Sequence, residues 1–94
     1  MGKAEVIAVL TNKMGLHARP STQIATTASR FSADVQITKD DMVVDAKSVL
    51  ELLMLAAECG SQLKITADGD DASQAVKAIA ELVDSRFGEL DVDA

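Results

Sequence analysis

The chain's single histidine, His17, stands two positions before Arg19 in the run Gly-Leu-His-Ala-Arg-Pro at 15–20. A neutral imidazole is a nucleophile that can form a covalent intermediate, and a guanidinium binds phosphate oxygens through planar, charge-assisted hydrogen bonds. The run lies where a loop is expected to enter a helix, whose first N–H groups and dipole favour anions. These residues predict a phosphoryl group carried on His17 and bound by Ala18 and Arg19.

A structural interpretation of the same residues is that His17 only caps the helix and that Arg19 is a solvated surface charge. Gly15, a flexible approach to the helix, and the small Ala18 favour chemistry instead. The sequence offers no second histidine, and no cysteine near His17, to complete a hydrolytic triad. We therefore expect a protein that becomes covalently phosphorylated and is not a self-contained catalyst.

Ser48 is the second candidate, because Ser-Val-Leu-Glu at 48–51 has the spacing of a capping box. The box explains the serine on structural grounds. A phosphate on an N-cap serine would also be tolerated, since its charge of about −2 would lie at the positive end of a helix dipole. Both interpretations can hold together.

A third feature is a short segment that is apolar nearly all round, formed by Val49, Leu50, Leu53 and Met54. These side chains either belong to the core or leave one side exposed as a docking patch for a protein partner. The sequence alone leaves both interpretations open.

Composition disfavours several classes of function. The net charge is −6, and Phe31 and Phe87 are the only aromatic residues, which disfavours binding to nucleic acid and to anionic membranes. Cys59 is the only cysteine, so it allows no internal disulfide, and with one histidine it cannot build a zinc site. We expect Cys59 to be buried or half-buried without a role.

Apolar runs in the sequence are shorter than the roughly 20 residues that span a bilayer. The first residues, Met-Gly-Lys-Ala-Glu-Val, lack the apolar stretch of a signal peptide and the Ser or Thr of a myristoylation signal. We therefore expect a soluble cytoplasmic protein without direct membrane insertion.

The elements that must position these residues follow from the spacing of apolar side chains. Alternating apolar and polar residues predict strands, and apolar residues recurring every three or four positions predict helices. The expected strands are 5–10, 34–38, 42–46 and 62–67. The expected helices are 18–30, a short one that begins at the capping box and stops at Gly60, and 72–87, which Asp71 and Gln74 would cap.

This order, β-α-β-β-α-β-α, predicts an α/β (α+β) fold of the open-faced β-sandwich type. A four-stranded antiparallel sheet would carry three helices on one face and leave the other in water. Residues 1–88 are expected to form one domain, followed by an acidic, frayed tail at 89–94.

The run at 15–20, together with Asp-Ala-Lys-Ser-Val-Leu at 45–50, resembles the histidine-containing phosphocarrier (HPr) family over about residues 3–88. These proteins are small carriers of the bacterial phosphoenolpyruvate-dependent phosphotransferase system. The resemblance implies that His17 accepts a phosphoryl group on Nδ1 from phosphorylated enzyme I and passes it to an enzyme IIA domain, in sugar uptake and its regulation. Arg19 would steady the phosphoryl group, and neither a metal nor a cofactor would be needed.

The resemblance also implies a regulatory role for Ser48, phosphorylated from ATP by a dedicated serine kinase/phosphorylase in those bacteria that possess one. A monomer suits a carrier that exposes one face to successive partners. The family's partner interface maps onto Ser21, Thr22, Val49, Leu50 and Leu53.

Two other functions stay open at this point. The first is a regulatory module of the nitrogen-type branch of the same system, in which the phosphorylation state signals to a kinase or transcription factor. The second, a small-ligand sensor of the ferredoxin-like type, is weaker, because the sequence shows no cluster of aromatic or polar residues that would form a pocket.

Overall fold

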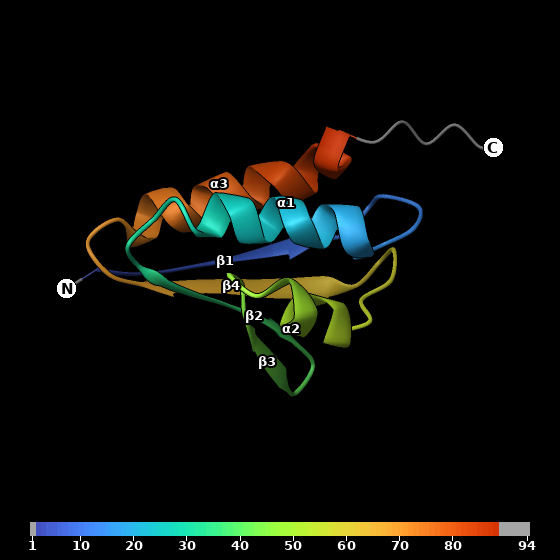
Figure 1. Cartoon of the computed structure of the whole chain (residues 1–94), viewed down its shortest axis with the longest axis horizontal. Helices are drawn as coiled ribbons and strands as arrows, with labels where there is room; N and C mark the ends of the chain where they lie inside the picture. The colour runs from blue at the N-terminus through green and yellow to red at the C-terminus, as the bar shows by residue number, and fades with distance from the viewer. Residues whose placement is uncertain (1, 89–94) are drawn as a thin grey trace.

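The computed structural model describes residues 2–88, so the tail predicted at 89–94 lies outside the described residues. The observed order of elements is the predicted one, with a short 3-10 helix, η1, added after the last helix (Figure 1). The strands are β1 (Lys3–Val9), β2 (Asp34–Lys39), β3 (Met42–Asp45) and β4 (Gln62–Asp68). The helices are α1 (Ala18–Ala28), α2 (Val49–Met54), α3 (Ala72–Asp84) and η1 (Arg86–Gly88).

The four strands form one antiparallel sheet in the order β1-β4-β2-β3, which confirms the predicted fold class. The register places Ile37 of the central strand β2 opposite Ile65 of β4 and Val44 of β3. Successive side chains on a strand point to opposite faces, so these apolar residues share one face of the sheet. Their polar neighbours, such as Lys64 and Thr38, lie on the other.

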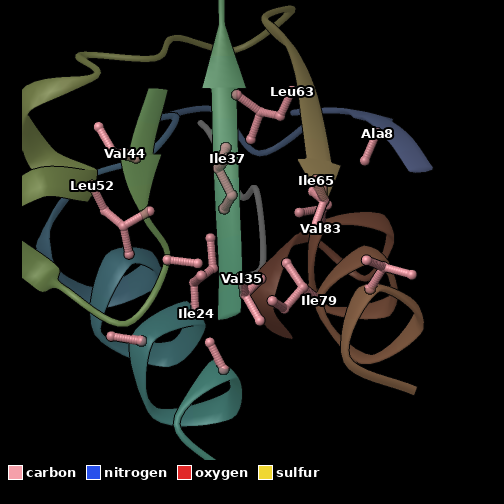
Figure 2. Close-up of a cluster of buried hydrophobic side chains, with 14 of the residues drawn as sticks. Ala8, Ile24, Val35, Ile37, Val44, Leu52, Leu63, Ile65, Ile79 and Val83 are labelled. Atoms are coloured by element: carbon pink, nitrogen blue, oxygen red, sulfur yellow. The ribbon is translucent and has the colours of Figure 1, made fainter. Parts of the chain in front are cut away.

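The core lies between this apolar sheet face and the helices (Figure 2). Ile24 of α1, Leu52 of α2 and Ile79 of α3 are all fully buried in the same cluster. Figure 2 shows them directed toward the labelled side chains of β2, β3 and β4. Because three helices contribute to one core on one side of the sheet, the start of α1 has a fixed position.

The second helix ends earlier than the sequence predicts. It stops at Met54, well before Gly60, and Ala56 adopts a left-handed conformation with φ +49°. The helix closes with tighter bonds from the amides of Leu55 and Ala56 to the carbonyl oxygens three residues earlier, and beyond it the carbonyl oxygen of Ala57 accepts the amide of Leu16 at 2.9 Å. The early end of α2 thus ties it to the loop that precedes α1.

Asp71 differs from its predicted role as a helix cap. It occupies the N-cap position of α3 but makes no side-chain capping bond. Its carboxylate accepts the amides of Ser32 and Ala33, each at 2.9 Å, and the Ser32 hydroxyl at 3.4 Å. Asp71 therefore holds the turn between α1 and β2 against the start of α3.

Candidate functional site

His17 occupies the N-cap position of α1, with an extended backbone at φ −93° and ψ −167°. Its imidazole makes no capping hydrogen bond, so the capping interpretation does not explain this side chain. The first helical bond runs from the Ser21 amide to the His17 carbonyl at 3.0 Å. The amides of Ala18 and Arg19 precede this bond, and Pro20 has no N–H.

The electrostatic character of this helix end favours an anion. No acidic residue lies in the first turn of α1, so no carboxylate of that turn neutralises the helix dipole. Arg19 is exposed, and within residues 2–88 its guanidinium has no carboxylate partner. His17 is half-buried beside them. The arrangement can hold a phosphoryl group on the imidazole between two main-chain donors and one cation.

The loop that presents His17 packs against the segment after α2. Gly15 has φ +68°, and a Cβ atom on it would lie 2.5 Å from the carbonyl oxygen of Ala57 and 2.9 Å from the Cα atom of Glu58. A side chain at position 15 would therefore separate the two segments. The fully buried Asn12 also binds this loop, since its Nδ2 atom donates to the Gly15 carbonyl oxygen at 2.7 Å.

Exposed apolar side chains gather on α2 and on the loop before α1. We call Met14, Leu50, Leu53 and Met54 the apolar patch; Leu50 is 75% exposed and Met14 70%. Helices α1 and α2 pack against each other (Figure 1), and the bond from Leu16 to Ala57 joins the loop that carries Met14 and His17 to the segment that follows α2. Only Leu52 of the helix is fully buried. The exposure favours the docking interpretation over the core interpretation.

Ser48 is the N-cap residue of α2, as the capping box predicts. Its hydroxyl oxygen accepts the amide of Glu51 at 3.2 Å. In a capping box the glutamate side chain usually accepts the amide of the N-cap residue. Here the Glu51 carboxylate accepts the amide of Asp45 instead, at 2.9 Å. Ser48 is half-buried.

Three other predicted positions have different outcomes. Ser21 is fully buried, which removes it from the predicted partner interface because it has no surface to offer. Thr22 is exposed, and its hydroxyl donates to the Ala18 carbonyl oxygen at 2.9 Å. Cys59 is exposed, contrary to our expectation of burial, because it follows α2 in the surface turn at Gly60.

Sequence reasoning missed Asn12 and Met14 as parts of the site region. The signal for Asn12 is its type, since asparagine in a turn commonly binds nearby main-chain groups. Nothing in the sequence indicates that Met14 belongs to this region, because a single methionine in a loop is not part of a repeating apolar pattern. Its exposure is a property of the folded loop.

The structure gives little that suits other classes of site. Two hollows on the open sheet face, one beside Glu5 and Thr66 and the other beside Ile7 and Lys64, include none of the predicted site residues. Among residues 2–88, no three His, Cys, Asp or Glu side chains are placed to hold a metal ion together. None of the helices in this range has the length and apolar character needed to cross a bilayer.

Comparison with known proteins gives consistent matches over most of the chain. A family model described as the PTS HPr component phosphorylation site matches residues 4–85. The phosphocarrier protein HPr of Neisseria meningitidis is 42% identical over 80 residues, which cover 85% of this chain and 90% of that protein. The phosphocarrier protein NPr of Shewanella violacea is 42% identical over 89 residues, covering 95% and 98%.

A solved structure resembles this chain both in fold and in sequence. The crystal structure of HPr-C-His from Thermoanaerobacter tengcongensis superimposes with a TM-score of 0.89 at 41% identity, over 93% of this chain and 98% of that one. The family model, the curated relatives and the fold all lead to the same assignment: this chain belongs to the HPr family of phosphocarrier proteins of the phosphotransferase system.

Proposed function

We propose that the chain relays a phosphoryl group through His17, from phosphorylated enzyme I to enzyme IIA domains of sugar permeases. The observation that carries the proposal is the position of His17 at the N-cap of α1, directly before Ala18 and Arg19, with no capping hydrogen bond from its side chain. We further propose that residues 1–88 form the carrier domain and that it acts as a cytoplasmic monomer.

The chemical step is an in-line exchange between two histidines. The lone pair of His17 Nδ1 attacks the phosphorus atom of the donor's phosphohistidine. The new bond from nitrogen to phosphorus forms as the donor's bond breaks, and the donor ring, which carries a proton on its other nitrogen, leaves as neutral imidazole. His17 keeps its proton on Nε2, so the exchange needs no external acid or base. The enzyme IIA histidine then repeats the step on the carrier.

The protein's contribution is positioning and charge neutralisation, as in other phosphoryl transfers. The amides of Ala18 and Arg19 and the Arg19 guanidinium would bind the phosphoryl oxygens, both in the transferring state and on the loaded carrier. The increase in rate depends on these donors being fixed in position before the reaction begins. Packing of α1 on the sheet provides that rigidity.

The apolar patch supports a shared docking surface for donor and acceptor. Leu50 and Leu53 are exposed on α2 and Met14 on the loop that leads to His17, and each partner must bring a histidine to that loop. The half-buried Val49 would lie at the edge of this surface, and Thr22 on the adjoining face of α1. Such a small patch suits a transient complex that dissociates after each transfer.

We also propose that Ser48 is a regulatory phosphorylation site in a cell that holds the matching serine kinase. The supporting observation is its place at the N-terminus of α2, next to Leu50 of the apolar patch. A phosphate there would add charge at the edge of the docking surface. It would slow the approach of enzyme I without unfolding the helix.

A second function, in the nitrogen-type branch, is favoured by one observation. The NPr protein of Shewanella violacea matches this chain at the same 42% identity as the Neisseria meningitidis HPr, and over more of its length. In this version His17 undergoes the same chemistry, and the phosphorylation state acts on a regulatory protein. The comparisons give no support to the small-ligand sensor.

The test of the proposed function is phosphoryl uptake with proteins of the same organism. The purified chain is mixed with phosphoenolpyruvate, magnesium and each enzyme I of that organism in turn. We expect one acid-labile phosphoryl group per chain, and the enzyme I with the higher kcat/KM identifies the branch. No uptake from any enzyme I would refute the carrier function.

A further inference from the structure

Asn12 takes no part in the chemistry proposed above, yet its side chain is bonded to the loop that carries His17. It is fully buried, and its Nδ2 atom donates to the carbonyl oxygen of Gly15 at 2.7 Å. The same oxygen accepts the amide of His17 at 3.0 Å. One carbonyl group therefore links the Asn12 side chain to the main chain of the proposed phosphoryl acceptor.

The loop between these residues is fixed from several directions. The Gly15 amide donates back to the Asn12 carbonyl oxygen at 3.1 Å, so the two residues are joined by bonds that run both ways. The Leu16 amide binds Ala57, and the Gly15 α-carbon faces the same segment with no room for a side chain. Within this loop, Asn12 supplies the side-chain donor that orients the Gly15 carbonyl.

We infer that Asn12 is a positioning residue for phosphoryl transfer: its amide holds the Gly15 carbonyl, and through it the His17 main chain, so that the imidazole stays beside the amides of Ala18 and Arg19. The inference rests on the proposed function of His17. Because the Gly15 carbonyl occupies the His17 amide, the donors left for a phosphate are those of Ala18 and Arg19. Without Asn12 the carbonyl could rotate, and the acceptor atom would lose its alignment with both.

Misalignment of this kind reduces the rate of the chemical step more than it weakens the binding of the donor protein. A displacement of about 1 Å can cost roughly 100-fold in rate. Docking would depend on the exposed apolar patch. Asn12 is fully buried and offers no surface to a docking partner. A purely structural Asn12 would instead lower stability and leave the chemistry of the folded protein unchanged.

The test compares Asn12→Ala and Asn12→Asp with the wild-type chain, using phosphorylated enzyme I as donor. Asn12→Asp keeps the shape of the side chain but replaces the amide donor by an acceptor. Ile79→Val is the matched control, because it disturbs a fully buried residue of α3 away from the loop. Each variant is assayed at a temperature where circular dichroism shows it folded, for kcat, KM and the hydrolysis rate of the isolated phosphoprotein.

We expect kcat to fall about tenfold or more in both Asn12 variants, with KM within about threefold of wild type and a changed hydrolysis rate. Ile79→Val should keep the wild-type values. Folded Asn12 variants with wild-type kcat and hydrolysis rate would overturn the inference while leaving the role of His17 intact. A wild-type chain that takes up no phosphoryl group would instead refute the proposed function, and with it this inference.

If the Asn12 variants do not fold, a second measurement tests the inference on the wild-type protein. NMR can detect the scalar coupling transmitted through the bond from the Asn12 side-chain amide to the Gly15 carbonyl, in the free and phosphorylated wild-type protein. We expect the coupling in both forms, because the bond must persist while His17 reacts. Its absence from either form would overturn the inference.

Discussion

The hydroxyl oxygen of Ser48 accepts the main-chain amide of Glu51 at 3.2 Å, while the carboxylate of Glu51 reaches back to the amide of Asp45 at 2.9 Å. Ser48 therefore holds the first turn of α2, and Glu51 joins that turn to the end of β3. A phosphate on Ser48 would stand at the helix N-terminus, where its charge is favourable, but close to the Glu51 carboxylate. The fold should tolerate this phosphate, but its negative charge should weaken docking at the adjacent apolar patch.

We predict that Ser48→Asp lowers the rate of phosphoryl uptake from enzyme I by about tenfold, because it adds negative charge at the edge of the apolar patch. The effect should fall mainly on KM, since His17 itself is untouched. Ser73→Asp is the matched control: it is an exposed serine in the first turn of α3, which begins at the end of the molecule opposite the start of α1 (Figure 1). Uptake by Ser48→Asp at the wild-type rate would contradict the proposed regulation.

Replacement of Arg19 should affect the chemical step more than docking. We predict that Arg19→Ala lowers kcat by about 100-fold and changes KM by less than about threefold, because the guanidinium acts on the phosphoryl oxygens. Arg30→Ala provides the comparison, since Arg30 is also exposed but follows the other end of α1. Equal losses in kcat and in affinity would show that Arg19 serves docking instead.

Gly15 should be among the least replaceable residues of the loop. Gly15→Ala places a methyl group 2.5 Å from the Ala57 carbonyl oxygen and also forces alanine into φ +68°. We predict a loss of about 3 kcal/mol or more in the free energy of unfolding, measured with urea. Gly88 has a similar φ of +74° but open space around an added Cβ atom. Gly88→Ala therefore measures the cost of the left-handed backbone alone and should lower the free energy of unfolding by about 1–2 kcal/mol. Similar losses in both variants would mean that the contact with Ala57 is unimportant.

Acid should weaken the attachment of the α1–β2 turn to α3. The amide of Ser32 lowers the pKa of Asp71 below its ordinary value of 3.8, with help from the Ala33 amide and against a smaller effect of burial. Because the folded-state pKa is the lower one, this contribution to stability is present above about pH 3.8 and is lost as the pH falls through the folded-state pKa. In urea unfolding at several pH values, the stability difference between wild type and Asp71→Asn should therefore shrink as the pH falls through this range. A difference independent of pH would contradict the role assigned to the carboxylate.

The sequence predicts those parts of the molecule that depend on local pattern. The alternation of Val35 and Ile37 with polar residues predicts β2, and the Gly-Leu-His-Ala-Arg-Pro run predicts a helix that begins beside His17. The serine cap of α2 follows from the spacing of Ser48 and Glu51. Each of these features involves residues within a few positions of one another.

Features that depend on distant contacts could not be predicted in this way. The bond from Leu16 to Ala57 joins segments about 40 positions apart, and the role of Asp71 depends on Ser32 and Ala33, 39 and 38 positions away. The burial of Ser21 reflects the packing of α1, against which α2 and α3 lie, and the local polarity of the residue does not reveal it. The same holds for the exposure of the apolar patch.

The most direct test of the phosphoryl relay uses radiolabelled phosphoenolpyruvate, enzyme I, an enzyme IIA domain and three forms of the chain. His17→Ala removes the chain's single histidine, and Ser48→Ala removes the proposed regulatory site while leaving His17 in place. We predict that wild type and Ser48→Ala pass the label to enzyme IIA and that His17→Ala neither gains nor relays it. Label that reaches enzyme IIA through His17→Ala would contradict the account.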